Sequence, residues 1–105
     1  MLFEFDKAEI LAEYKAVIQE NATKLLDNPS MVATIEGHAD ERGTNEYNLA
    51  LGQRRAEAIR DALIESGVPP SQLQTITFGE ERPSDLGHNE EAWRLNRRGE
   101  MVVNP

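Results

Sequence analysis

A short β-rich run between two amphipathic stretches constrains the fold of this chain most strongly. Residues Met31 to Ile35 are rich in β-branched side chains, and helical patterns lie on both sides of them. Strand–helix–strand units have right-handed crossovers and build a parallel or mixed sheet with helices packed against it. The pattern therefore predicts an α/β protein.

Two helices are predicted on either side of this run. The first has apolar residues spaced three and four apart, at Leu11, Tyr14, Ile18, Ala22 and Leu25. Asp6 is well placed to cap its start, and Asp27-Asn28-Pro29 ends it. The second helix follows Thr44, whose hydroxyl suits an N-cap, and runs to about Ser66, where Gly67 closes it.

Three further strands and a short helix complete the expected fold. Leu2 to Phe5, Gln74 to Gly79 and Met101 to Val103 are predicted strands, and Glu90 to Asn96 is a short helix. The chain order is then βαβαβ(α)β. We expect an α/β (α+β sandwich) fold with a four-stranded mixed sheet, helices packed on one face, and a single domain over residues 1–105.

Composition limits the possible partners. The net charge is −8 at pH 7, so the surface repels phosphate backbones and no nucleic-acid partner is expected, whereas cationic or zwitterionic ligands are favoured. The absence of cysteine excludes disulfides and thiolate metal sites. No apolar run approaches the ~20 residues that span a bilayer. We expect an excised domain whose upstream targeting region is absent.

One charged residue of the second predicted helix lies on its apolar side. At ~100° per residue, Arg55 falls on the same stripe as Leu51 and Ile59, four residues from each. A guanidinium facing the core needs a partner, because an unpaired buried charge is very costly. Asp40 is the nearest candidate, since it follows the second strand, where open α/β sheets usually place ligand sites.

Two interpretations of Asp40 and Arg55 remain open. In one, they form a buried ion pair that fixes the loop to the helix. In the other, a ligand with an amino group and a carboxylate lies between them, and Asp40 binds the ammonium while Arg55 binds the carboxylate through its planar fork. Asn48, one helical turn from the helix start, would add a donor and an acceptor.

Metal and catalytic chemistry have less support. His38 and Asp40 form an H-x-D pair, but a third metal ligand would have to come from a distance, and the only other histidine is His88. The serines lack a nucleophile-elbow context, and pairs such as Glu80-Glu81 suit a solvated surface. We therefore expect no enzyme, no metal site and no cofactor.

The central motif resembles the OmpA-like peptidoglycan-binding domain. It runs from Gly37 to Thr44 as GHADERGT and continues through Tyr47-Asn48 and Leu51-Gly52 to Arg54-Arg55-Ala56. Phe78 to Pro83, with the sequence FGEERP, is similar to the peptidoglycan-associated lipoprotein (Pal) branch of that family. The resemblance covers nearly the whole chain.

The resemblance implies a domain that binds the peptide stem of peptidoglycan without covalent bonds, through meso-diaminopimelate. It assigns Asp40 and Arg55 as the central ligand-binding pair. It assigns the supporting contacts to Phe5, Asp6, Asn48 and Leu51. This agrees with the zwitterion that the charge pattern itself favours.

Partners and location also follow from the resemblance. It implies peptidoglycan and TolB as partners, a role in the Tol-Pal system, and a periplasmic protein tethered to the outer membrane by lipid. The chain has no cysteine that could carry this lipid. Alternatives are a cell-envelope protein–protein interaction module, the wall-anchoring domain of a porin or flagellar stator, and a cell-wall hydrolase.

Overall fold

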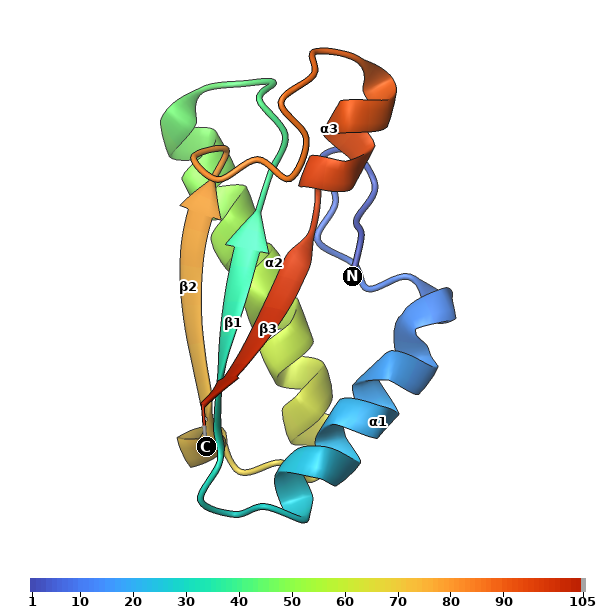
Figure 1. Ribbon diagram of the computed structural model, residues 1–105, viewed down its shortest axis with the longest axis vertical. Helices are drawn as coiled ribbons and strands as arrows, with labels where there is room; N and C mark the ends of the chain where they lie inside the picture. The colour runs from blue at the N-terminus through green and yellow to red at the C-terminus, as the bar shows by residue number, and fades with distance from the viewer. Residues whose placement is uncertain (105) are drawn as a thin grey trace.

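The computed structural model describes residues 1–104, which form a three-stranded sheet with helices beside it (Figure 1). Beyond the N-terminal segment, the helices and strands follow one another in the order that the sequence predicts. They are η1 (Ala12–Tyr14), α1 (Lys15–Leu26), β1 (Val32–His38), α2 (Asn45–Glu65), η2 (Pro70–Gln72), β2 (Leu73–Gly79), α3 (Glu90–Asn96) and β3 (Gly99–Asn104).

The sheet is mixed and has β1 at its centre. The strand order is β2-β1-β3, with β1 parallel to β2 and antiparallel to β3. The α/β class and the mixed sheet are therefore confirmed. The expected fourth strand is wrong, because the described residues form only three.

The N-terminal segment is the reason for the difference. Leu2 makes an isolated bridge to Arg98, and Phe3 donates its backbone N–H to Arg97 at 2.7 Å, but the pairing goes no further. The chain then turns, since Lys7 donates to the carbonyl of Glu4 at 3.1 Å. A ladder needs extended backbone, and this tight turn ends it.

The expected cap of the first helix is also wrong. Asp6 lies within the N-terminal turn and has a φ of 56°, a left-handed conformation that aspartate tolerates better than most residues. The first α-helix begins only at Lys15, after a 3-10 turn. Its end is as predicted, with Asp27 as the C-cap. Asp6 therefore does not cap α1, and its side chain is available for other contacts.

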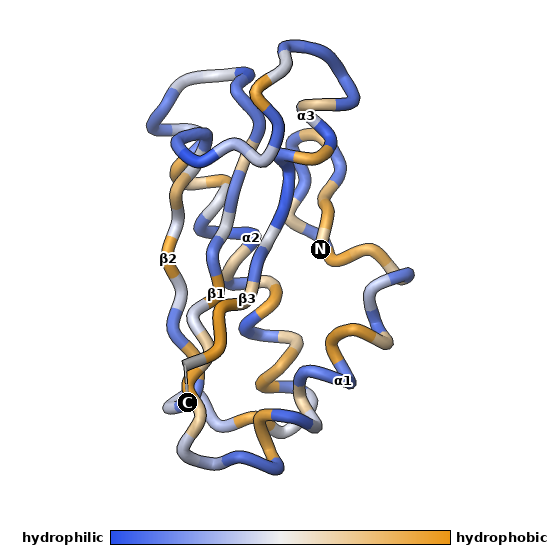
Figure 2. The backbone as a smooth tube through the Cα atoms, in the orientation of Figure 1, coloured by the Kyte–Doolittle hydropathy of each residue, from blue (hydrophilic) through white to orange (hydrophobic). Residues whose placement is uncertain are grey.

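The hydrophobic core lies between one face of the sheet and the two long helices. Ala33 and Ile35 of β1 point to this face and are fully buried. They pack in one cluster with Ile18, Ala22, Leu25, Ala56, Ile59, Leu63 and Val68. Figure 2 shows hydrophobic positions along the lower part of the molecule and mostly hydrophilic loops beyond the end of β1. The polar end therefore lies where the sequence predicts the ligand site.

Two glycines let α2 approach β1 closely beside this end. A Cβ on Gly37 would lie 1.7 Å from the carbonyl oxygen of Gly52, and one on Gly52 would lie 2.4 Å from Thr77 Oγ1. Neither position has room for a side chain. The contact fixes the height of α2 against the sheet.

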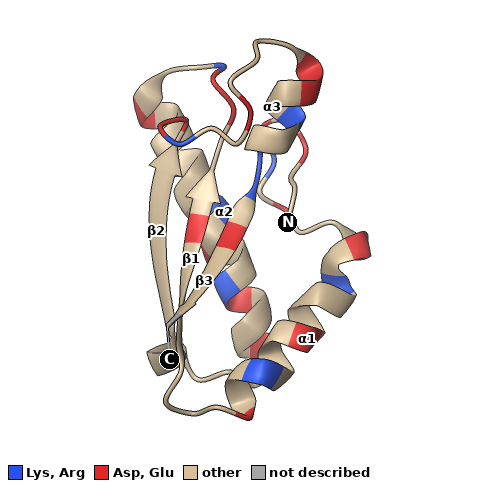
Figure 3. Ribbon diagram, viewed as in Figure 1, with Lys and Arg blue, Asp and Glu red and all other residues tan. Residues whose placement is uncertain are grey.

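The remaining helix predictions are confirmed. Thr44 caps α2 by accepting a hydrogen bond from the backbone N–H of Tyr47 at 3.2 Å, and α3 spans the predicted residues. Charged residues gather in the loops around the end of β1 and along α1 and α2 (Figure 3). Within residues 1–104, no helix combines the length and apolar character needed to cross a bilayer.

Candidate ligand-binding site

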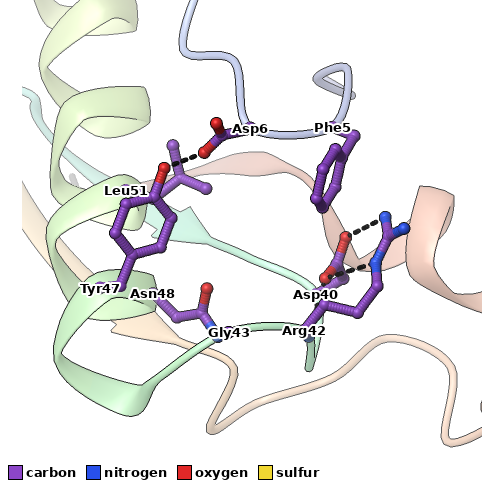
Figure 4. Close-up of a pocket in the computed structure, with 8 residues that line it drawn as sticks. All are labelled: Phe5, Asp6, Asp40, Arg42, Gly43, Tyr47, Asn48 and Leu51. Atoms are coloured by element: carbon purple, nitrogen blue, oxygen red, sulfur yellow. Dashed lines mark hydrogen bonds and ion pairs between the residues drawn. The ribbon is translucent and has the colours of Figure 1, made fainter.

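A pocket of about 240 Å³ lies between the N-terminal turn, the loop after β1 and the start of α2 (Figure 4). Three separate chain segments therefore build it. The lining residues are Phe5, Asp6, Asp40, Arg42, Gly43, Tyr47, Asn48 and Leu51. The pocket lies beyond the carboxyl end of β1, as expected for an open α/β sheet.

The structure brings most of the predicted site residues together here. The lining includes all four predicted supporting residues and Asp40. Arg55 is the exception, because it is fully buried and does not line the pocket. Sequence reasoning placed Arg55 correctly on the core side of its helix, but gave it different neighbours.

The Arg55 guanidinium binds three backbone carbonyls. Nε donates to Lys7 at 2.9 Å, Nη1 donates to His38 at 2.8 Å and Nη2 donates to Glu4 at 3.1 Å. Glu4 and Lys7 flank the turn that carries Phe5 and Asp6. Arg55 thus ties this turn to the end of β1.

Asp40 and Arg55 make no direct ion pair among residues 1–104. The interpretation as a closed ion pair is therefore wrong for this structure. Burial lowers the pKa of Arg55 to about 10, although the nearby Asp40 carboxylate acts to raise it. The side chain remains charged at neutral pH, so its positive field reaches the pocket that it supports.

Asp40 is bound by Arg42 instead. Arg42 donates its backbone N–H to Oδ1 at 2.9 Å and Nη2 to Oδ2 at 2.9 Å, and Arg97 Nη1 lies 3.6 Å from Oδ2. Burial of Asp40 acts to raise its pKa, but hydrogen bonds from Arg42 and the charges of Arg42 and Arg97 lower the pKa below its usual value. The carboxylate is therefore held ionised although it is almost wholly buried.

Arg42 stands between two aromatic rings. Its guanidinium carbon lies 4.0 Å from the centre of the Phe5 ring and 4.3 Å from that of Trp93. Phe5 nevertheless remains 54% exposed, which leaves an apolar edge at the pocket mouth. In the sequence, Arg42 stands out only as part of the GHADERGT motif. Its position two residues after Asp40 gave no period or face from which this role could be derived.

The opposite side of the pocket is held by a tyrosine. Tyr47 donates its hydroxyl to Asp6, which joins the start of α2 to the N-terminal turn. The buried Asn48 amide donates to Glu80 at 3.3 Å and so is oriented from the loop that follows β2. Tyr47 was part of the motif, but its link to Asp6 depends on a turn that the sequence pattern did not predict.

The lining suits a ligand that carries both signs of charge. It offers the Asp6 and Asp40 carboxylates, the Arg42 guanidinium, the Asn48 amide and the apolar Leu51. Its walls therefore combine anionic, cationic, amide and apolar groups within one small pocket.

Comparison with known proteins assigns the chain to a family. The model of the OmpA family matches residues 2–97. The chain therefore belongs to the OmpA family.

Within this family the chain is similar to peptidoglycan-associated lipoproteins. That of Haemophilus influenzae is 47% identical over 100 residues, covering 95% of this chain and 65% of the relative. That of Brucella melitensis is 46% identical over 104 residues, covering 99% of this chain and 62% of the relative. The chain thus spans somewhat less than two thirds of the length of these proteins.

Solved structures agree with this assignment. The crystal structure of the peptidoglycan-associated lipoprotein from Burkholderia pseudomallei superposes with a TM-score of 0.97 at 45% identity, covering 98% of this chain and 87% of that one. The C-terminal domain of Helicobacter pylori MotB superposes with a TM-score of 0.85 at 23% identity, covering 100% and 84%, which shows a shared fold only.

Proposed function

We propose that this chain binds peptidoglycan without covalent chemistry, through the meso-diaminopimelate of the stem peptide. The observation that carries the proposal is the pocket itself, in which Phe5, Asp6, Asp40, Asn48 and Leu51 meet. The names of the relatives, which associate them with peptidoglycan, support the same ligand.

Asp6 and Asp40 are the groups for the ligand ammonium. Both are carboxylates that line the pocket, and a short cationic group between them forms charge-assisted hydrogen bonds. The pKa of Asp40 is already held low by Arg42, so this carboxylate is available as an anion at neutral pH. A ligand ammonium would share Asp40 with Arg42, whose side chain is 30% exposed.

The ligand carboxylate would lie nearer Arg55 and the start of α2. Arg55 spends three of its N–H groups on Glu4, Lys7 and His38, and an arginine has five, so two remain. The amino end of α2 adds a favourable dipole for an anion. Because Arg55 is buried and does not line the pocket, direct contact with the ligand carboxylate requires the turn from Glu4 to Lys7 to shift, and this contact is part of the proposal.

The cellular role follows from the same ligand. A domain that holds the peptide stem and belongs to a lipid-anchored protein would tether the outer membrane to the cell wall from the periplasm. No catalysis is required for this role. The lipid anchor would belong to a part of the protein outside this chain.

Calorimetric titration with a diaminopimelate-containing stem peptide tests the proposal. Asp40→Asn keeps the side-chain shape but removes the charge, and should weaken binding about 10- to 100-fold, which corresponds to one charge-assisted hydrogen bond. Asp61→Asn, on the exposed side of α2, is the matched control and should bind like the wild type. Equal binding by wild type and Asp40→Asn would show that the site is wrong.

Docking of a protein partner such as TolB is the second candidate. Leu86 is 80% exposed in the loop between β2 and α3, close to Glu41 of the motif, and offers an apolar contact beside the pocket. Binding of TolB should then be weakened by Leu86→Ser and unchanged by Asp61→Asn. Unaltered binding by Leu86→Ser would remove this surface from consideration.

A further inference from the structure

A second group of polar side chains lies on the face of the sheet opposite the hydrophobic core. Glu36 and His38 are on β1, and Glu100 is the direct antiparallel partner of Glu36 on β3. One potential ligand atom from each lies within 4.8 Å of the other two. Figure 3 shows the acidic bands of β1 and β3 at the same height, as this register requires.

His38 is the unusual member of the group. It is only 1% exposed, yet neither ring nitrogen has a hydrogen-bond partner among the described residues. Its ring stacks on Phe78 with centroids 5.5 Å apart, and Nε2 lies 3.5 Å from Glu36 Oε1, a contact without hydrogen-bond geometry. Because buried polar atoms are nearly always paired, an imidazole of this kind indicates a missing partner.

The two glutamates point to the charge of that partner. Like charges directly opposite one another on neighbouring strands destabilise a sheet. Arg98 relieves only part of the repulsion between the two glutamates. Its Nε donates to Glu100 Oε1 at 2.6 Å, but its Nη2 donates to the carbonyl of Arg82 at 2.7 Å. A cation between Glu36, His38 and Glu100 would balance the charge of the two glutamates. It would also give a ring nitrogen of His38 the partner that it lacks.

We propose that Glu36, His38 and Glu100 bind a divalent transition-metal ion, of which Zn²⁺ is the best match. Zn²⁺ accepts both imidazole nitrogen and carboxylate oxygen as ligands, and water can complete the coordination. In a tetrahedral site two donors on one Zn²⁺ are ~3.4 Å apart, so the partly exposed carboxylates need to close by up to roughly 1.4 Å from the present limit of 4.8 Å.

This site differs from the metal site considered in the sequence. There, His38 and Asp40 lacked a third ligand, and no metal was expected. The fold supplies Glu100 from β3 and places Asp40 in the ligand pocket instead. The proposed site thus lies outside the lining of the pocket, and the two are linked only through the His38 carbonyl, which accepts a hydrogen bond from Arg55. A bound ion would fasten β3 to β1 and raise the thermal stability of the sheet.

Zinc titration of tag-free, chelator-treated protein tests the proposal. Calorimetry should show one equivalent bound, and NMR of protein labelled with ¹⁵N at histidine should show the shifts on a His38 ring nitrogen. His38→Gln should weaken binding at least about 10-fold, since even losses in the outer shell of a metal site reach that size. His88→Gln is the matched control, because His88 is the only other histidine and lies in an exposed loop.

Glu100→Gln protects the test against a His38 variant that fails to fold. This side chain is about half exposed, so the change should leave the fold intact while weakening zinc binding at least about 10-fold. Three results would overturn the proposal: no zinc binding by the wild type, shifts confined to His88, or unchanged affinity in Glu100→Gln. The wild type should also melt at a higher temperature with zinc than without it.

Discussion

The two ends of the sheet each contain one buried polar side chain that gathers backbone carbonyls. At the pocket end, the Arg55 guanidinium donates to Glu4, Lys7 and His38. At the opposite end, the Gln72 amide Nε2 donates to Leu25, Asn28 and Met31 at 2.9 to 3.0 Å. Both side chains hold loops onto the ends of strands, but only one carries a charge.

Under the proposed function, the difference separates a structural role for Gln72 from a binding role for Arg55. A neutral amide satisfies carbonyls at a low desolvation cost, which is all that the Gln72 end requires. A buried guanidinium costs more, as the lowered pKa of Arg55 reflects, and a fold that needed only to fasten loops would not require it. We infer that the charge is retained for the ligand, and that Gln72 serves only the fold.

Arg55→Ala should have the largest effect. It leaves three carbonyls without their donor and should lower the free energy of unfolding by about 3–5 kcal/mol, with water satisfying part of the loss. Stem-peptide binding should be abolished. Urea unfolding and calorimetry measure the two effects, and Arg55→Lys, which keeps the charge but not the fork, should recover only part of each.

Gln72→Ala should destabilise the chain without affecting the ligand. The loss of one amide shared by three carbonyls should lower the free energy of unfolding by about 1–3 kcal/mol. Peptide affinity, measured well below the melting temperature, should remain that of the wild type. A parallel loss of affinity would show that the two ends are coupled and would break the comparison.

Asp40→Asn should change how stability depends on pH. Because the pKa of Asp40 is lowered in the folded state, its ionised form stabilises the fold above the unfolded value near 3.8. This contribution is lost as the pH falls from that value through the lower folded pKa. The wild type should therefore exceed Asp40→Asn in stability at pH 7, and the gap should shrink below pH 3.8. Urea unfolding at pH 7 and below pH 3.8 measures this difference in the free energy of unfolding. A difference that is the same at the two pH values would contradict the pairing of Asp40 with Arg42.

Phe5→Ala should have the smallest effect. The exposed ring stacks on Arg42 at the pocket mouth, and losing this contact should weaken peptide binding about 2- to 5-fold with little loss of stability. Ile76→Ala removes a similarly exposed apolar side chain from the open face of the sheet and should bind normally. If both variants bound equally well, Phe5 would have no part in the site.

The same contrast explains what the sequence could predict. The period of α2 placed Arg55 on the buried side because neighbouring residues along a helix determine its faces. The partners of Arg55 could not be derived, since backbone carbonyls carry no sequence signature. The turn at Asp6 was missed for a related reason: an apolar run at Leu2 to Phe5 resembles a strand until a distant arginine binds the carbonyls around it.

The most direct test of the proposed site is an NMR titration with two stem peptides that differ only in their third residue. One carries meso-diaminopimelate and the other carries lysine, which lacks the extra carboxylate. We predict tight binding of the first, with the largest amide shifts at Phe5, Asp6, Asn48 and Leu51, and much weaker binding of the second. Equal binding of both peptides, or shifts confined to residues outside the pocket, would contradict recognition of the zwitterionic end in this pocket.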